Sequence, residues 1–422
     1  MRCVEPATRL RGRVRVPGDK SASHRAVLLA ALAEGSSHVT NLSPGEDVGR
    51  TMGIVTALGA RVESSPAGAL VVGPSRLAAS PTALECGNSG TTMRLVAGMA
   101  ASIPGTHRLV GDASLSQRPM DRVAIPLREM GARVEGQGER CTAPLVVEAP
   151  GALAAIDYAV PVPSAQVKSA ILLAGLGAEG PTTVTEAVRT RATTETMLAA
   201  AGVRVETEAR GAGRRVRVWP GRPRPHDWSV PGDPSQAAFF VVLAAVHPDA
   251  HIEIPGLADE PERLGFLAVL ERMGADLVRE HHDGVLDVVA RSSTLLATTV
   301  DAAEIPSVDE VPALVVAAAA ARGVSAFRDV GELRIKESDR FRGSLELAEA
   351  LGCRAWSEGD DLFIEGRDGA RFADFTLDAA LDHRRVMAAA VAAVCGRGGC
   401  IAGDDTVATS FPSFFDELGG LT

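Results

Sequence analysis

Lysine is scarce in this chain of 422 residues, and the few lysines that remain stand out. Three of the 43 basic residues are lysines, namely Lys20, Lys168 and Lys336, and the other 40 are arginines. Such a ratio is typical of GC-rich coding. A lysine that persists under this bias indicates a position where a compact, titratable ammonium does something that a guanidinium cannot. Chance survival is the alternative explanation for any one of them.

Metal-binding and membrane-spanning patterns are also missing. The six cysteines form no CxxC pair, and none stands with a histidine at zinc-ligand spacing, which predicts reduced thiols and no metal site. They are Cys3, Cys86, Cys141, Cys353, Cys395 and Cys400. No stretch reaches 18 uninterrupted apolar residues, and the first residues lack the apolar core of a signal peptide. We therefore expect a cytoplasmic protein.

An excess of positive charge is absent as well. The 53 acidic residues outnumber the 43 basic ones, which gives a net charge of −10. This balance argues against a general electrostatic grip on nucleic acid or anionic membrane, although it permits a local basic pocket. With 46% hydrophobic and 23% charged residues, the composition is typical of a globular protein of two or three domains.

One signature recurs six times along the chain: an apolar helix end, then a glycine, then a strand-like run. The glycines are Gly59, Gly131, Gly202, Gly274, Gly352 and Gly419, at intervals of 72, 71, 72, 78 and 67 residues. A glycine in this place can adopt the left-handed conformation that ends a helix. A unit of about 70 residues is too long for common solenoid repeats and too short for a separate domain, so the copies must share cores. We expect two α/β halves of three units each.

Two Pro/Gly-rich stretches predict where the chain crosses between the halves. They are residues 13–20 (RVRVPGDK) and 219–235 (WPGRPRPHDWSVPGDPS). If both are hinges, the N-terminal strand belongs with the second half. The predicted domains are therefore 17–229 for the first half, and 1–16 together with 230–422 for the second half.

Two helix starts in the first half carry residue types that bind anions. The segment GDKSASHR places Lys20, Ser21 and Arg25 at the start of an apolar helix that Ser21 or Ser23 would cap, where free N–H groups and the helix dipole favour a phosphate or carboxylate. In GNSGTTMR, Gly90 lets the backbone approach a ligand closely. This spacing matches neither the Walker loop nor the dinucleotide-binding fingerprint.

Two further helix starts in the first half repeat the theme. The segment VPSAQVK presents Ser164, the backbone amide of Ala165, and Gln166, and Thr190 and Arg191 precede the next helix. Each start taken alone can be routine helix capping. Four of them together predict ligands with several negative groups.

The second half carries three charged segments beside apolar helices. They contain Asp309 and Glu310, then Lys336, Glu337, Asp339 and Arg340, and then Asp382, His383 and Arg384. At helical spacing, Lys336 and Arg340 would project from the same face. The alternatives are acidic helix capping for the first segment, a solvated charged face for the second, and a structural histidine in the third.

The motifs GDKSxSHR, GNxGTTxR, GDxSLxxRPM, SAQVKSA, DExP, RxKESDR, LDHR and DDTxxATSFPxF follow one another over the whole chain. In this order they resemble the 5-enolpyruvylshikimate-3-phosphate (EPSP) synthase family of enolpyruvyl transferases. The resemblance implies an α/β fold of two domains, each an inside-out barrel of three βαβαββ repeats. It also implies transfer of the enolpyruvyl group of phosphoenolpyruvate to the 5-hydroxyl of shikimate 3-phosphate, with release of phosphate and without metal or cofactor.

The resemblance further implies roles for individual residues. Contacts to shikimate 3-phosphate would come from Lys20, Ser21, Arg25, Ser164, Ala165, Gln166, Thr190, Arg191, Asp309 and Lys336. Contacts to phosphoenolpyruvate would come from Lys20, Gly90, Arg118, Gln166, Arg340 and Arg384. The catalytic groups would be Asp309, which takes the 5-hydroxyl proton, Glu337, which helps protonate the methylene carbon, and the two lysines Lys20 and Lys336. The implied partners are these two small molecules, with no nucleic acid or membrane, and we expect a monomer.

Some positions depart from the family pattern. Many relatives read RDHTE where this chain has Ala192 and Thr193 in place of the Asp-His pair, one group has a lysine at Thr409, and Arg385 adds a charge after LDHR. Another group of relatives also has threonine at the position of Thr409. Ala192, Thr193 and Arg385 motivate, as an alternative, a paralogous enolpyruvyl transferase that acts on a shikimate-like acceptor in secondary metabolism. A sister transferase acting on UDP-N-acetylglucosamine usually carries a cysteine where this chain has Ala113. A non-catalytic binding homologue is the third alternative, although the implied acid, base and arginines are all present.

Overall fold

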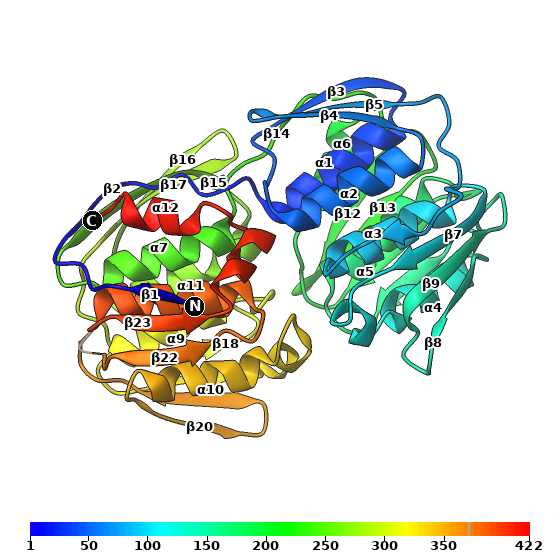
Figure 1. Ribbon diagram of the computed structural model, residues 1–422. Helices are drawn as coiled ribbons and strands as arrows, with labels where there is room; N and C mark the ends of the chain where they lie inside the picture. Colours follow the sequence, from blue (N-terminus) through cyan, green and yellow to red (C-terminus); the bar gives the residue numbers. More distant parts are fainter. Residues whose placement is uncertain (370–371) are drawn as a thin grey trace. The chain divides into compact units, whose positions relative to one another are not determined.

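The computed structural model describes residues 1–369 and 372–422. It divides into two compact units, Gly18–Val230 (the first half) and Met1–Pro17 with Pro231–Thr422 (the second half) (Figure 1). Each boundary lies one residue after the position expected from the Pro/Gly-rich stretches. Within the described residues, no helix is long and apolar enough to cross a membrane.

The first half contains three copies of the order strand, helix, strand, helix, strand, strand. One copy comprises β6 (Leu84–Glu85), α3 (Gly90–Ala101), β7 (Gly105–Val110), α4 (Asp121–Glu129), β8 (Arg133–Gln137) and β9 (Thr142–Ala149). The next comprises β10 (Asp157–Val160), α5 (Ala165–Gly175), β11 (Thr182–Glu186), α6 (Thr193–Ala200), β12 (Val205–Arg210) and β13 (Gly213–Val218). The remaining copy comprises α1 (Lys20–Leu32), β3 (Gly35–Thr40), α2 (Glu46–Ala57), β4 (Arg61–Ser65) and β5 (Gly68–Gly73), and takes its first strand, β14 (Trp228–Ser229), from the end of the segment.

The second half repeats the same order. Its first copy comprises β2 (Leu10–Arg13), α7 (Pro234–Val246), β15 (Ala250–Ala258), α8 (Gly265–Arg272), β16 (Asp276–His282) and β17 (Val285–Arg291). The next comprises β18 (Thr299–Asp301), α9 (Val311–Ala320), β19 (Val324–Arg328), α10 (Arg340–Ala350), β20 (Arg354–Glu358) and β21 (Asp361–Glu365). The last comprises β22 (Phe375–Asp378), α11 (His383–Cys395), β23 (Gly399–Ala402) and α12 (Phe414–Gly419). Short 3₁₀ helices are η1 (Leu115–Gln117), η2 (Pro261–Arg263), η3 (Gly331–Ile335) and η4 (Asp404–Thr409).

The sheets share one strand order. In the described residues, five sheets have four strands, as in β10-β11-β13-β12, where the first pair is parallel and the others are antiparallel. The sixth sheet has the order β1-β23-β22, and β1 (Arg2–Val4) pairs antiparallel with β23 in the place of a hairpin. The expected α/β fold of six repeats is therefore confirmed; five repeats have the full βαβαββ order, and in the sixth the single N-terminal strand β1 replaces the closing strand pair.

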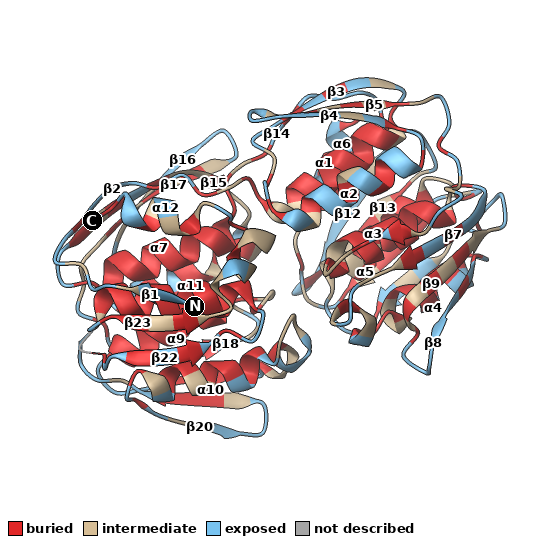
Figure 2. Ribbon diagram, in the orientation of Figure 1, coloured by how far each residue is buried: buried red, intermediate tan, exposed pale blue. Residues whose placement is uncertain are grey.

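One helix of each repeat is buried almost completely (Figure 2). All residues of α7, α9 and α11 are buried, and beyond the polar first turn of α7 and α11 their sequences are apolar on every side, as a helix enclosed by other layers requires. The helices α1, α3 and α5 are the counterparts in the first half. All six begin at or directly beside polar residues, so the cores end where the polar motifs start.

The glycine signature marks five of the six helix ends as predicted. Gly59, Gly131, Gly202, Gly274 and Gly352 have φ values between 78° and 108°, which glycine adopts without strain. The sixth expectation is wrong, because Gly419 is the last residue of α12 and is not in the left-handed region.

The prediction that all six cysteines are reduced thiols is wrong for two of them. Cys3 and Cys400 form a disulfide, and they face each other across the β1–β23 pair with their Cα atoms 4.0 Å apart. Sequence spacing gave no sign of this pair because 397 residues separate the two strands. The other four cysteines are buried and free, and burial raises the pKa of Cys86 to about 12 and that of Cys353 to about 11. Thiols of this kind are poor nucleophiles.

Candidate active site

The buried helices of the first half bring their N-terminal residues together. The guanidinium of Arg25 on α1 donates to Ser169 Oγ on α5 at 2.7 Å, and Gln166 Nε2 on α5 donates to Thr91 Oγ1 on α3 at 2.9 Å. The three polar motifs that precede these helices therefore form one cluster. Several helix N-termini at one place favour a ligand with more than one negative charge.

Each of these helices has a side chain that caps its backbone. Ser89 accepts from the Thr92 amide and Ser164 from the Val167 amide, whereas Asp19 accepts from the Ala22 amide at 2.6 Å. The expectation that Ser21 or Ser23 caps the first helix is wrong, because that helix begins at Lys20 and both serines lie inside it. Asp19 is a strong N-cap and leaves the Ser21 hydroxyl available for other contacts.

Lys20 and Arg191 stand at the edges of this cluster. Lys20 Nζ lies 3.0 Å from Asp47 Oδ2, and both side chains are about 15% exposed. Arg191 Nη1 donates to Ser21 Oγ at 2.7 Å. The structure thus brings Arg191 to the GDKS motif, from which it is separated by 170 residues in sequence.

Gly90 is the first residue of α3 and lies beside two guanidiniums. A Cβ atom placed on it would be 3.4 Å from Nη1 of both Arg118 and Arg94. Arg118 is 9% exposed, and its Nη2 donates to Asn88 Oδ1 at 2.7 Å. Two sources of positive charge, the helix N-terminus and the guanidiniums, favour a phosphate or carboxylate here.

Arg94 is a site residue for which the sequence motifs predicted no contact to either substrate. Its guanidinium donates to Gln166 Oε1, while Gln166 Nε2 donates to Thr91. These two bonds fix which end of the Gln166 amide carries the oxygen. The available signal was the arginine at the end of GNSGTTMR, but nothing in the sequence pointed from it to Gln166.

In the second half, Asp309 lies between the buried guanidiniums of Arg340 and Arg384. Its Oδ1 is 3.2 Å from Arg340 Nη1 and its Oδ2 is 3.6 Å from Arg384 Nη2, and Arg384 Nη1 also donates to the Asp309 carbonyl at 3.1 Å. The arrangement places a proton acceptor directly beside two cations that can each bind an anion.

Arg340 is the centre of the carboxylate network in this half. It is 1% exposed, contacts Asp382 Oδ2 and Oδ1 at 2.7 and 3.1 Å, and lies 2.7 Å from Glu337 Oε2. Burial alone would lower the pKa of the guanidinium, but Asp382, Glu337 and Asp309 raise it. Burial likewise opposes ionisation of Asp382, yet Arg340 and His383 hold the pKa of Asp382 below its ordinary value of 3.8. The cluster is therefore charged and internally paired.

Lys336 does not share a helix face with Arg340, so that expectation is wrong. Lys336 follows η3 in an extended conformation, and α10 begins at Arg340. Its Nζ lies 3.2 Å from Glu332 Oε1. The sequence suggested helical spacing because the charged run RIKESDR continues into α10, but Asp339 caps the helix by accepting from the Arg342 amide and sets its start.

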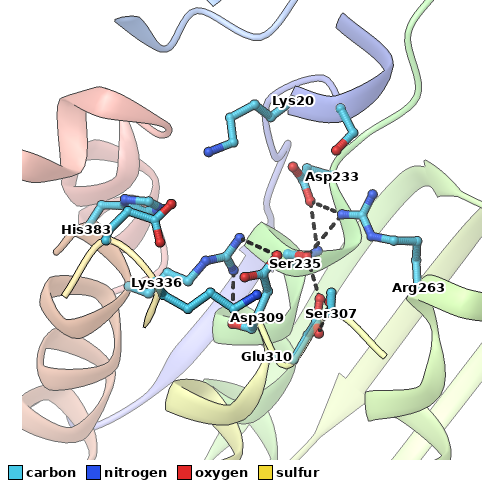
Figure 3. Close-up of polar contacts among 12 residues, drawn as sticks. Lys20, Asp233, Ser235, Arg263, Ser307, Asp309, Glu310, Lys336 and His383 are labelled. Atoms are coloured by element: carbon cyan, nitrogen blue, oxygen red, sulfur yellow. Dashed lines mark hydrogen bonds and ion pairs between the residues drawn. The ribbon is translucent and has the colours of Figure 1, made fainter. Parts of the chain in front are cut away.

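Glu310 supports the segment that carries Asp309. It is 2% exposed and accepts hydrogen bonds from Ser307 Oγ at 2.9 Å and from Ser235 Oγ (Figure 3). Ser235 in turn accepts from Arg263 Nη2 at 3.0 Å. The alternative that Glu310 caps its helix is not observed, because its side chain makes no capping bond to α9.

The backbone is strained directly before two of these carboxylates. Val308 has a φ of 49°, and Ala380 and Leu381 have φ values of 48° and 58°. A β-branched residue rarely adopts this region, and such positions cost about 1–3 kcal/mol each and gather at functional sites. Strain next to Asp309 and Asp382 is consistent with a site that demands a fixed geometry.

Arg385, which adds a charge to the family pattern after LDHR, forms an ion pair. Its Nη2 lies 2.8 Å from Glu346 Oε2 on α10, and the side chain packs against Gly343. The extra charge is thus paired locally. His383 contacts Thr409 Oγ1 through Nδ1 at 3.2 Å, so this histidine and the departure at position 409 are neighbours.

Among the described residues, no three or more His, Cys, Asp or Glu side chains are grouped so that they could hold a metal ion. The clusters contain cations, carboxylates, hydroxyls and helix N-termini. This inventory suits binding of polyanionic substrates and proton transfer between them.

Comparison with known proteins points to one family. Residues 4–418 match the family model described as EPSP synthase (3-phosphoshikimate 1-carboxyvinyltransferase). A 3-phosphoshikimate 1-carboxyvinyltransferase of Chloroflexus aurantiacus is 43% identical over 420 residues, which covers 97% of this chain and 96% of the relative. The structure of EPSP synthase from Acinetobacter baumannii matches with a TM-score of 0.86 at 37% identity, covering 99% and 97% of the two chains.

A more distant solved structure shares the architecture. The enolpyruvyl transferase NikO from Streptomyces tendae matches with a TM-score of 0.79 at 19% identity, over 99% of this chain and 96% of NikO. At this identity the match shows the fold alone.

Proposed function

The chain belongs to the EPSP synthase family, and from this premise we propose how it transfers the enolpyruvyl group of phosphoenolpyruvate to the 5-hydroxyl of shikimate 3-phosphate. The observation that carries the proposal is the placement of Asp309, a proton acceptor, between the guanidiniums of Arg340 and Arg384. An anionic substrate bound by these arginines would lie next to the group that removes the proton.

Phosphoenolpyruvate carries a phosphate and a carboxylate, and its proposed contacts are mostly cations. They are Lys20, Gly90, Arg118, Gln166, Arg340 and Arg384. Planar guanidiniums can bind either anionic group through two hydrogen bonds. Support comes from Gly90, which opens a helix beside two arginines, and from Gln166, whose amide orientation is fixed by Arg94 and Thr91.

Shikimate 3-phosphate is proposed to use the GDKS cluster and its neighbours. Its contacts are Lys20, Ser21, Arg25, Ser164, Ala165, Gln166, Thr190, Arg191, Asp309 and Lys336. Arg25, Ser21 and Arg191 support this assignment because they already contact one another or a shared neighbour in the first half. A phosphate there would meet two guanidiniums and the N-terminus of α1.

The proposed chemistry needs a base and an acid at different atoms. The 5-hydroxyl oxygen bonds to C2 of phosphoenolpyruvate while its proton passes to Asp309, and a proton from Glu337 adds to the methylene carbon C3. The tetrahedral intermediate then expels inorganic phosphate from C2, and the phosphate leaves with the proton that Asp309 had taken. A proton from C3 returns to the Glu337 carboxylate, which restores the double bond and regenerates the acid. Lys20 and Lys336 neutralise charge near the reacting groups. The proton transfers themselves cannot be made by the arginines of the site, because arginine keeps its proton at neutral pH.

A coupled phosphate-release assay tests the function. Phosphate should appear only when both phosphoenolpyruvate and shikimate 3-phosphate are present. Hardly any release with shikimate 3-phosphate, together with turnover of a shikimate-like acceptor, would favour the secondary-metabolism paralogue. Calorimetric binding of both substrates without turnover would favour a non-catalytic homologue. The extra charge of Arg385 was one argument for a paralogue with another acceptor, and its ion pair with Glu346 weakens that argument.

We further propose that the protein works as a cytoplasmic monomer of 43.7 kDa without metal, organic cofactor, nucleic acid or membrane partner. Light scattering gives the mass in solution. Turnover should be unchanged after dialysis against a chelator.

A further inference from the structure

Lys168 is the one lysine to which the proposed substrate contacts give no role. It lies on α5, two residues after Gln166, and its side chain is 0% exposed. An ammonium without water is costly to bury unless acceptors surround it. Its surroundings therefore indicate why this position keeps a lysine in a chain of arginines.

The ammonium of Lys168 uses all three of its donors. Nζ donates to Glu195 Oε1 at 2.8 Å, to Glu186 Oε2 at 2.9 Å and to the carbonyl of Arg191 at 2.9 Å. These acceptors come from α6, from the end of β11 and from the segment between them. A compact ammonium can meet three converging acceptors, whereas a planar guanidinium spreads its donors in a fork.

A second cation balances the charges. Arg214 on β13 is 7% exposed as a residue, its Nη1 lies 3.2 Å from Glu195 Oε1, and its Nε lies 3.8 Å from Glu186 Oε2. Lys168, Glu186, Glu195 and Arg214 form a buried group of two cations and two carboxylates, which we call the Lys168 cluster. Its net charge is zero, as burial requires.

The Lys168 cluster holds the segment 187–192, which has no helix or strand of its own. Lys168 binds the Arg191 carbonyl, and Glu186 accepts a hydrogen bond from the Thr190 hydroxyl. Arg191 then reaches Ser21 with its guanidinium. The Arg191 backbone and the Thr190 side chain are thus held from inside the protein, while the Arg191 side chain reaches Ser21 in the GDKS motif.

We propose that Lys168 is a positioning residue that, through the Lys168 cluster, fixes Thr190 and Arg191 for the phosphate of the acceptor substrate. The inference rests on the proposed assignment of these two residues to shikimate 3-phosphate. It predicts a selective effect. Loosening the cluster should weaken binding of the acceptor phosphate, because the Arg191 backbone is no longer held in place. Binding of phosphoenolpyruvate should stay nearly unchanged.

The test is steady-state kinetics of the double variant Lys168→Met/Glu195→Gln, which removes one charge of each sign and keeps the remaining Arg214–Glu186 pair neutral. The KM for shikimate 3-phosphate should rise about tenfold or more, and the KM for phosphoenolpyruvate should stay within about twofold. The preference for shikimate 3-phosphate over unphosphorylated shikimate, taken as the ratio of kcat/KM values, should fall by the same factor as the acceptor affinity.

Two further variants separate positioning from folding. Lys168→Arg keeps the charge without the three-way geometry and should also raise the KM for shikimate 3-phosphate, so it carries the test if the double variant does not fold. Leu172→Ala, a fully buried apolar position on the same helix, should lower the melting temperature without a selective change in either KM. It is the control for general destabilisation.

The wild-type assay separates this inference from the proposed function. If wild-type protein releases phosphate from both substrates, and the Lys168 variants that fold keep the wild-type KM for shikimate 3-phosphate, the positioning role is wrong. It is also wrong if the Lys168 variants change the KM values for both substrates by the same factor, because such a change is not selective for the acceptor. Failure of the wild-type protein to use shikimate 3-phosphate would overturn the proposed function itself.

Discussion

At the scale of single residues, the second half depends on one buried guanidinium. Arg340 is paired with Asp382, Glu337 and Asp309, and Asp382 also accepts from Ser338 Oγ at 2.8 Å and from the Arg384 amide at 2.9 Å. Removing one member of such a buried network leaves a charge without its partner, which costs far more than the net worth of the pair.

The variant Asp382→Asn isolates this charge, because asparagine keeps the size and remains a good N-cap for α11. We expect it to lower the free energy of unfolding by about 3–5 kcal/mol at pH 7, measured in denaturant. Since the pKa of Asp382 is lower in the folded protein than in the unfolded chain, its contribution is present above about pH 4 and is lost as the pH falls through the folded value. The gap between wild type and variant should therefore narrow on acidification. A gap that widens below pH 4 would contradict the assignment.

Gly90 bears a second prediction at this scale. The absence of a side chain leaves room beside Arg118 and Arg94, so we expect glyphosate to inhibit the enzyme in competition with phosphoenolpyruvate. Gly90→Ala places a methyl group 3.4 Å from both guanidiniums and should raise the inhibition constant about tenfold or more, with little change in the KM for shikimate 3-phosphate. Undiminished activity of wild-type enzyme at a large excess of glyphosate would be evidence against this placement.

At the scale of helices and strands, the polar motifs are held by close packing of the helices behind them. Gly98 on α3 faces the α5 backbone, and a Cβ atom on it would lie 2.2 Å from the Ala170 carbonyl oxygen. The close approach brings Thr91 and Gln166, at the starts of these helices, within hydrogen-bond distance.

Gly98→Ala should therefore push α3 and α5 apart and lower the free energy of unfolding by about 1–3 kcal/mol. The matched control is Gly53→Ala on α2, where no atom lies within 4 Å of the added methyl group. That substitution should be neutral or stabilising by up to about 1 kcal/mol, because alanine favours a helix. Equal melting temperatures for the two variants would show that the close approach is unimportant.

The sequence predicted the elements well where the signal was local. A helix end, a left-handed glycine and a following strand depend on neighbouring residues, and five of six such sites were placed correctly. Features that depend on distant neighbours were missed or misjudged: the helical spacing of Lys336 and Arg340, the bond from Arg94 to Gln166, and the three bonds that Lys168 donates. These contacts exist because separate helices converge, which spacing along the chain does not encode.

At the scale of the whole molecule, an acidic chain carries local groups of cations. Its net charge is −10, yet Arg25, Arg94, Arg118 and Arg191 gather at helix N-termini of the first half, and Arg340 and Arg384 flank Asp309 in the second. Such a distribution keeps the protein soluble while still attracting small polyanions to defined positions.

The disulfide gives a prediction at the same scale, because it joins β1, at the start of the chain, to β23 in its last repeat. Replacing Cys3 and Cys400 with serine should lower stability by about 2–5 kcal/mol when wild type is oxidised, measured as a shift in denaturant midpoint. Turnover should remain, since no proposed substrate contact lies on either strand. In a reducing buffer the two proteins should become similar. Six titratable thiols in unreduced, denatured wild type would mean that the bond does not form.

The most direct measurement is the turnover of Asp309→Asn in the phosphate-release assay with both substrates. This substitution keeps the shape and removes the base, so kcat should fall by at least about 100-fold while both substrates still bind. Asp276→Asn is the control, since Asp276 also pairs with an arginine, at 3.3 Å, but on an exposed strand, and its turnover should equal that of wild type. Near-normal turnover of Asp309→Asn would contradict the assignment of Asp309 as the base.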